Sequence, residues 1–187
     1  MKKTILLIIS ALLVFTLIAC TPKEKPLEPE VPGVEEPASP PEEPVEKIEE
    51  EDVVLYFGNN EYVLTGDEKL ERMLTENRTI SYGPQVCLEE AIVRALMDGP
   101  KDTEKMSTGF PQSVQLIGVN TLDGTSYVNF KSDGLNGGSM EESYIISQIV
   151  QSLGNLDYVD RVQFLIDDQE AESLMGHISI EEPIEVD

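Results

Sequence analysis

Residues 114–130 read VQLIGVNTLDGTSYVNF, and they carry the clearest structural signal in the chain. Two runs rich in β-branched and aromatic residues, 114–119 and 125–130, flank the dipeptide Asp123-Gly124. This dipeptide between two apolar runs is a strong signal for a tight hairpin turn. The stretch therefore predicts an antiparallel β-hairpin near the middle of the folded region.

Upstream of this hairpin, the pattern predicts further strands and one helix. Residues 53–57 form a short apolar run that ends at Gly58-Asn59-Asn60, and we expect residues 62–64 to pair back on it. Residues 72–80 are expected to form another strand. Apolar residues recur at helical spacing over 88–97, which predicts a helix there.

Downstream of the hairpin, a second helix and a last strand are expected. Ser139 stands three residues before Glu142, a capping-box pattern that predicts a helix over 139–154. The run 162–166 predicts a strand, after which Asp167-Asp168 turns the chain into a C-terminal tail. Together these elements predict an α+β fold, a small mixed β-sheet with two helices packed on one face.

The N-terminal segment 1–20 reads MKKTILLIISALLVFTLIAC. Two lysines precede an uncharged run over 4–19 that is shorter than the roughly 20 residues of a spanning helix. Leu17-Ile18-Ala19-Cys20 resembles the bacterial lipobox, in which the cysteine becomes the first mature residue and carries lipid. We therefore expect a lipoprotein signal peptide over 1–19 and lipidation at Cys20. The alternatives are an ordinary secretory signal and a short anchor helix.

Residues 20–52 are expected to form a disordered linker behind the lipidated cysteine. Within 21–52 lie eight of the twelve prolines, and twelve acidic residues face three lysines. Such a segment cannot bury enough apolar surface to offset its ordering entropy. It acts either as a tether that lets the folded domain reach partners above the membrane or as a spacer that holds the domain away from the membrane. The folded domain is expected over 53–187.

The charge of the chain restricts its partners. Thirty-six acidic residues face thirteen basic ones, which gives a formal net charge of −23. Nucleic-acid binding requires a basic face, and anionic lipid headgroups also attract basic segments, so neither is an expected partner. Basic proteins and cations stay open as partners.

The residues that catalysis usually recruits are scarce. His177 is the only histidine, and Cys87 is the only cysteine besides Cys20. One histidine and one available thiol serve zinc poorly, because zinc sites use three or four such ligands. We expect His177 to be a hydrogen-bonded structural residue and Cys87 a buried structural thiol.

The acidic and glycine-rich motifs also favour structural roles. Asp167-Asp168 with Glu170 and Glu172 could hold a hard cation but lacks the spacing of a calcium loop, so a solvated cluster is expected. Glu89-Glu90 and Glu141-Glu142 lie in the first helical turns, where they favour the helix dipole. Gly137-Gly138-Ser139 could receive an anion, but no lysine follows as in a P-loop. We expect no catalytic, metal or cofactor-binding residues.

An ordered series of short motifs resembles the GerMN domain, the sporulation and spore germination domain of Gram-positive and related bacteria. The series consists of Leu96 with Gly99-Pro100, Phe110-Pro111, residues 116–119, 127–130, Gly137-Gly138-Ser139, 162–167, Gly176-His177 and Glu182-Pro183. The resemblance implies an extracytoplasmic domain without known catalysis, often on a lipoprotein, with a fold similar to ring-building motifs of sporulation secretion complexes. The family's spore germination protein carries two such domains, whereas this chain has room for one.

These observations lead to one expected function and one alternative. The expected protein is a lipoprotein on the outer face of the cell membrane, anchored through Cys20, with a non-catalytic scaffolding domain for an unidentified envelope protein. Its binding edge is expected along 53–57 or 162–166. The alternative is a cell-wall polymer hydrolase, which would need two carboxylates converging in a deep cleft.

Overall fold

The computed structural model describes residues 47–186. The expected signal peptide, Cys20 and most of the expected linker lie outside this range. The elements, in chain order, are β1 (Glu49–Asn59), α1 (Asn60–Thr65), β2 (Met73–Tyr82), α2 (Leu88–Asp98), β3 (Met106–Ser107), β4 (Leu116–Leu122), β5 (Thr125–Phe130), α3 (Ser139–Leu153), β6 (Arg161–Ile166), β7 (Gln169–Glu170) and β8 (Ile184–Glu185). No helix within residues 47–186 is long and apolar enough to cross a membrane.

The strands form two sheets. The first has the order β2-β1-β3 and is antiparallel throughout. The second has the order β4-β5-β6, and β7 and β8 both pair with the far side of β6. Strands β5 and β6 run parallel while their neighbours run antiparallel, so this sheet is mixed. The α+β class is therefore confirmed.

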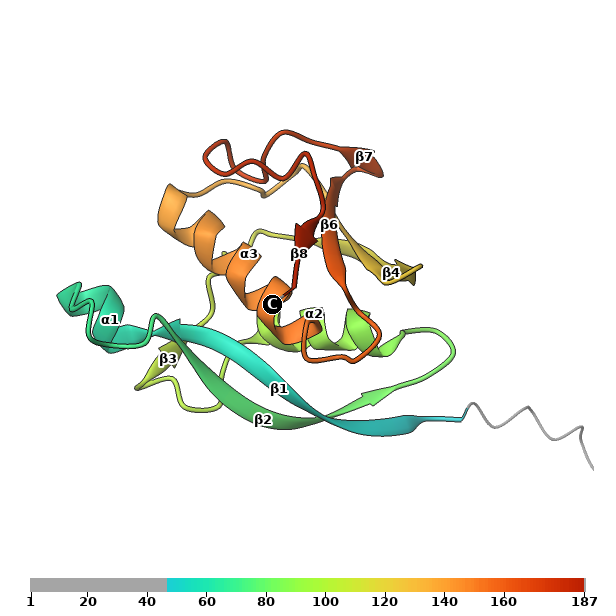
Figure 1. The fold of residues 1–187 in the computed structure, drawn as a ribbon, viewed down its shortest axis with the longest axis horizontal. Helices are drawn as coiled ribbons and strands as arrows, with labels where there is room; N and C mark the ends of the chain where they lie inside the picture. Colours follow the sequence, from blue (N-terminus) through green and yellow to red (C-terminus); the bar gives the residue numbers. More distant parts are fainter. Residues whose placement is uncertain (1–46, 187) are drawn as a thin grey trace, which may run out of the picture. The chain divides into compact units, whose positions relative to one another are not determined.

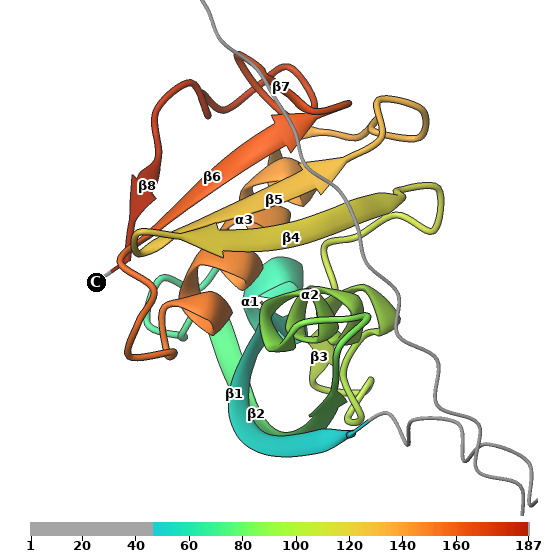
Figure 2. The same cartoon turned by 90° about the vertical axis from the view of Figure 1, so that its right-hand side faces the viewer.

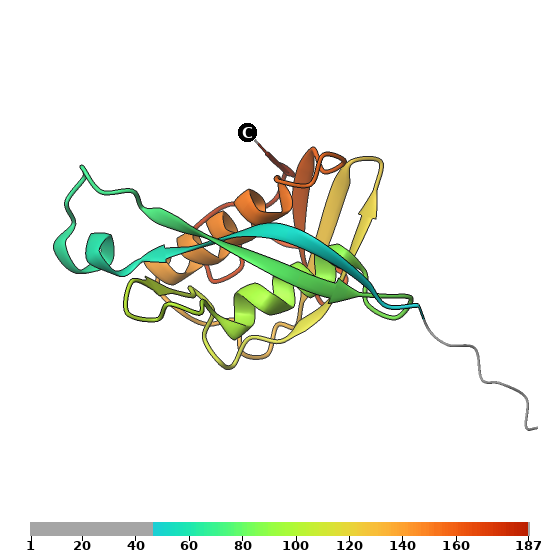
Figure 3. The ribbon, with the colours of Figure 1, turned by 90° about the horizontal axis from the view of Figure 1, so that it is seen from below.

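Helices α2 and α3 lie between the two sheets (Figures 1 and 2). Helix α3 packs against β1 and β6, and α2 packs against β2 and β4. From below, the long ribbon of β1 and β2 crosses over both helices (Figure 3). The fully buried side chains between these layers include Leu55, Phe57, Ile92, Leu96, Val128, Phe130, Ile145, Ile149 and Phe164. The expected helices on one face of a mixed sheet are thus present, and the first sheet covers their other side.

The strongest sequence signals correspond to observed elements. The hairpin of β4 and β5 turns at Asp123 (φ 49°) and Gly124 (φ 76°), the two positive values that a type I′ turn requires. The expected strand over 72–80 is β2, and the expected helix over 88–97 is α2. The last expected strand, 162–166, is β6.

The expected hairpin partner at 62–64 is wrong, because these residues belong to helix α1. The Asn59 side-chain oxygen accepts hydrogen bonds from the N–H groups of Glu61 (3.0 Å) and Tyr62 (3.4 Å). Asparagine is a favoured N-cap residue, so Asn59 starts a helix where the sequence pattern indicated a turn. Strand β1 pairs with β2 instead.

The start of α3 also differs from the capping box expected at Ser139 and Glu142. Gly138 is the N-cap residue, and its N–H donates to the Glu141 carboxylate at 3.1 Å. Glu142 is fully buried and accepts hydrogen bonds from the N–H groups of Met175 (2.9 Å) and His177 (2.8 Å). Its carboxylate therefore fixes the C-terminal segment to the first turn of α3.

The first strand begins at Glu49, inside the segment assigned to the linker. The Tyr82 hydroxyl donates to Glu49 at 3.0 Å, and the Thr79 hydroxyl donates to Asp52 at 2.6 Å. These contacts across the ladder hold four acidic residues in a strand, although their composition alone indicated disorder.

Candidate binding edge

Strand β2 lies at one edge of the first sheet, and its outer side is open. The N–H of Asn59 donates to the C=O of Arg72 at 3.0 Å, which fixes the alternation of the antiparallel ladder. Every second residue from Leu74 to Tyr82 therefore bonds toward β1. The residues whose N–H and C=O groups point away from β1 are Met73, Thr75, Asn77, Thr79 and Ser81. These backbone groups have no hydrogen-bond partner within residues 47–186.

The side chains along this edge do not protect it. Thr75, Asn77, Thr79 and Ser81 are all exposed and uncharged. The pairing with β1 runs without a bulge from Glu49↔Tyr82 to Gly58↔Met73. Proteins usually block an open edge with proline, outward-facing charges, bulges or a covering element. Strand β2 has no proline, no bulge and no outward-facing charge. Its open edge can therefore accept another strand.

On the side of β2 that faces α2, an ion pair between Glu76 and Arg78 helps to hold the edge strand in place. Arg78 also donates to the C=O of Ala95 (3.2 Å), in the last turn of α2, and to the C=O of its C-cap residue Gly99 (3.0 Å). The Glu76 carboxylate accepts the N–H of Lys101 at 2.7 Å. A cation on these carbonyls favours the helix dipole, so the same contacts stabilise α2 and fix the position of β2.

The edges expected from sequence, 53–57 and 162–166, are both less open than the edge of β2. Strand β1 pairs with β3 only at Gly58 and Asn59, and along 53–57 this side lies against α3, where the Tyr56 N–H donates to the Ser152 hydroxyl at 3.0 Å. Strand β6 lies between β5 and the pair β7 and β8. The remaining outer strand, β4, is approached by α2, where the Cys87 thiol donates to the Val119 C=O at 3.5 Å. The edge of β2 is therefore the longest open backbone edge in the described chain.

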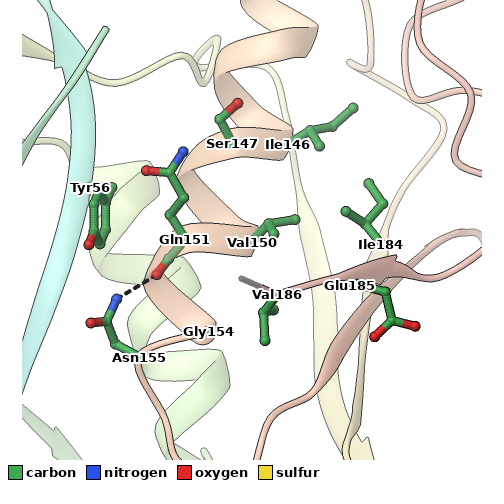
Figure 4. Close-up of a pocket in the computed structure, with 10 residues that line it drawn as sticks. All are labelled: Tyr56, Ile146, Ser147, Val150, Gln151, Gly154, Asn155, Ile184, Glu185 and Val186. Carbon is green, nitrogen blue, oxygen red and sulfur yellow. Dashed lines mark hydrogen bonds between the residues drawn. The ribbon is translucent and has the colours of Figure 1, made fainter. Parts of the chain in front are cut away.

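Two grooves of the described chain have carboxylates in their lining, as a hydrolase would require. One, of 320 Å³, follows the outer face of α3 between Tyr56 and β8, and Glu185 is the one carboxylate in its lining (Figure 4). The other, of 360 Å³, contains Glu51, Asp52 and Asp157, all of them exposed. The acid of a glycosidase is usually held protonated by burial, and the carboxylates of these two grooves are exposed, so neither groove supports the hydrolase alternative.

The two residues with potential reactivity occupy structural positions. Cys87 is half-buried at the N-cap of α2, and burial raises the pKa of its thiol. His177 is exposed, its N–H donates to Glu142, and its ring nitrogen lies 3.3 Å from the Gly137 C=O. Both contacts attach the C-terminal segment to the loop before α3.

The acidic and glycine motifs are also accounted for by local structure. Asp167 and Asp168 form a two-residue turn between β6 and β7, with φ values of 48° and 65°. The Asp168 carboxylate accepts a hydrogen bond from the Asn129 side chain at 2.6 Å. Within residues 47–186, no three His, Cys, Asp or Glu side chains converge as metal ligands. Gly137-Gly138-Ser139 forms the start of α3.

A family model described as "Sporulation and spore germination", named Germane, matches residues 54–172. The chain belongs to this family. A search of curated protein sequences found no significant match. The Germane region runs from residue 54, inside β1, to just after β7, so it contains both helices of the core and the open edge of β2.

Solved structures share the Germane fold at low sequence identity. The first GerMN domain of the sporulation protein GerM from Bacillus subtilis is 14% identical, with a TM-score of 0.56, 72% of this chain and 96% of that chain covered. The tandem GerMN domains of GerM give 15%, 0.53, 81% and 50%, respectively. A "Putative Lipoprotein from Clostridium perfringens" gives 20%, 0.50, 73% and 87%. The chain spans half of the tandem structure, as expected for one domain copy.

Proposed function

We propose that this chain is a lipoprotein on the outer face of the cell membrane whose Germane domain is a non-catalytic binding and scaffolding module. Its place of action is the cell envelope, in sporulation or spore germination. The observation that carries this proposal is the open, rigid edge of β2, which presents five residues with free backbone groups. A partner is recognised there by addition of a strand to the sheet.

The anchor is proposed from the sequence and from the likeness to the structure titled "Putative Lipoprotein from Clostridium perfringens". Residues 17–20 carry the lipobox pattern, and a lipidated Cys20 would hold the chain at the membrane. The described domain begins at residue 47, so 26 residues separate it from the cysteine. A fully extended chain of that length reaches about 80 Å, which gives the β2 edge access to partners well above the membrane surface.

Strand addition suits a scaffold because affinity and specificity come from different groups. The free N–H and C=O groups of β2 would bond to any extended partner strand. The exposed side chains of Thr75, Asn77 and Thr79 select among partners through cross-strand contacts. Because the edge is already held by Arg78 and Glu76, little ordering entropy is lost on binding.

The test uses the full chain in its native membrane, with a photo-crosslinking amino acid at Thr79. We expect a covalent adduct that disappears in the Asn77→Lys variant, which places a charge at the centre of the edge. The matched control is Asn120→Lys, a change of an equally exposed asparagine on β4, which should leave the adduct intact. His177→Ala should also leave it intact.

Two results would contradict the proposal. One is an adduct from Thr79 that survives Asn77→Lys, because the β2 edge would then not carry binding. The other is cleavage of wall polymer by the purified chain, if the cleavage requires His177 or a carboxylate pair at unchanged stability. Circular dichroism of each variant separates a lost contact from a lost fold.

A further inference from the structure

Residues 74–80 of β2 read LTENRTI. If a second copy of this seven-residue segment runs antiparallel to the first, each residue lies opposite a residue of complementary or like character. Asn77 is the centre of the segment. Moving outward, Glu76 is matched by Arg78, Thr75 by Thr79 and Leu74 by Ile80. Two such strands laid antiparallel about Asn77 would thus place opposite charges, two threonines and two apolar side chains against each other.

We propose that the strand added to β2 is β2 of a second copy of this chain, paired antiparallel about a two-fold axis at Asn77. This inference rests on the proposed function of the β2 edge and names its partner. The product is one continuous six-stranded sheet with the order β3-β1-β2-β2-β1-β3, because each copy contributes its three-stranded first sheet.

The backbone of β2 fits this register. The residues that point their N–H and C=O groups outward are Met73, Thr75, Asn77, Thr79 and Ser81. With Asn77 opposite Asn77 of the second copy, Thr75 meets Thr79 and Met73 meets Ser81. Every outward-pointing residue then faces another, and the two strands can form about ten N–H···O bonds.

The side chains favour this register over its neighbours. Glu76 of each copy would lie opposite Arg78 of the other, beside the ion pair that these two residues already form within one copy. A shift that centres the pairing on Glu76 places two glutamates opposite each other, and a shift to Arg78 places two arginines opposite each other. Like charges directly opposite in a ladder are destabilising, whereas opposite charges stabilise it. Asn77 is therefore the centre that charge complementarity selects.

The acidity of the chain opposes self-association but acts far from the new contact. Each copy has a formal net charge of −23, yet residues 73–82 contain one glutamate and one arginine. The acidic run Glu49–Asp52 lies on β1, one strand behind the edge. The runs of the two copies would be at least three strand spacings apart, about 14 Å. This exceeds the Debye length of about 10 Å at 0.1 M salt, so repulsion between the two runs is largely screened at that salt concentration.

Cysteine cross-linking tests the register in the full chain, purified in detergent. A hydrogen-bonded antiparallel pair has a Cα separation of about 5.5 Å, which suits a disulfide. Asn77→Cys should give a disulfide-linked homodimer, and a mixture of Thr75→Cys and Thr79→Cys should give a heterodimer. Thr75→Cys alone and Asn120→Cys should give only the wild-type background from Cys20 and Cys87. A Thr75→Cys and Asn77→Cys heterodimer of equal yield would refute the Asn77 centre.

Charge reversal at the two-fold axis supplies an independent test by light scattering. Asn77→Lys alone and Asn77→Asp alone should each be monomeric, and their equimolar mixture should recover the dimer. Failure of both the cross-links and this recovery, while Asn77→Lys still loses the cellular adduct at Thr79, would overturn self-pairing and leave the proposed function standing. If Asn77→Lys also keeps the cellular adduct, both fall.

Discussion

Replacement of Glu142 by glutamine should destabilise the domain far more than the same change at its neighbour Glu141. The buried Glu142 carboxylate accepts two backbone N–H groups, from Met175 at 2.9 Å and His177 at 2.8 Å. Glutamine keeps one acceptor oxygen and turns an NH₂ group toward the other donor. A hydrogen bond to a charged group contributes about 1.5–3 kcal/mol, and the orphaned buried N–H adds a similar penalty. We expect a loss of about 3 kcal/mol in the free energy of unfolding.

Glu141 is the matched control because it is exposed and accepts one N–H, that of Gly138 at 3.1 Å. Glutamine serves equally well at this capping position, so Glu141→Gln should cost less than about 0.5 kcal/mol. Urea unfolding with an unchanged slope measures both values. Hydrogen exchange should also show faster exchange at the amides of residues 175 and 177 in Glu142→Gln. Equal stability of the two variants would refute the reasoning that Glu142 fixes the C-terminal segment.

Three further predictions concern the anchor, the domain boundary and pH. Cys20→Ser should leave the precursor unprocessed, and mass spectrometry of the wild-type membrane fraction should find lipid on Cys20; an unmodified Cys20 there would exclude the anchor. Residues 47–187 should unfold as cooperatively as 21–187, with or without chelator, whereas 53–187 should be about 1–2 kcal/mol less stable because it lacks the ladder from Glu49 to Asp52; an equal stability of 53–187 would show that these residues add nothing. Partial burial, and then the charge of Glu89, raises the pKa of Tyr158 from 10.0 to about 12, although the residue is 52% exposed. The folded state thus favours the protonated phenol, and its contribution to stability is full below pH 10 and is lost as the pH rises to about 12. Tyr158→Phe should flatten the pH dependence of stability in this window, and an unchanged curve would count against the assignment.

The elements that the sequence predicted are those with strong local signals. Asp123-Gly124 defines the hairpin because both positions need positive φ, and the apolar spacing of 88–97 defines α2. The family assignment likewise followed from short motifs in a fixed order. Such signals depend on neighbours in the sequence and need no knowledge of the fold.

The features that sequence reasoning missed depend on distant contacts. Asn59 caps α1 only because β1 ends there, and that end is set by pairing with β2. Glu142 lies three residues before Ile145 and seven before Ile149 on the apolar stripe of α3, a spacing that would have indicated burial. The strand at 72–80 was predicted, but its place at the sheet edge follows from pairing with β1 and from the covering of β4 and β6. Sequence alone therefore did not identify β2 as the longest open edge.

Hydrogen exchange along β2 is the most direct test of the claim that its outer edge binds a partner strand. The amides of Met73, Thr75, Asn77, Thr79 and Ser81 should exchange fast in the dilute monomer and become protected in the assembled state. The amides of Leu74, Glu76, Arg78 and Ile80 should be protected in both, because they bond to β1. Protection of the first set in the dilute monomer, or its fast exchange in the assembled state, would contradict the account.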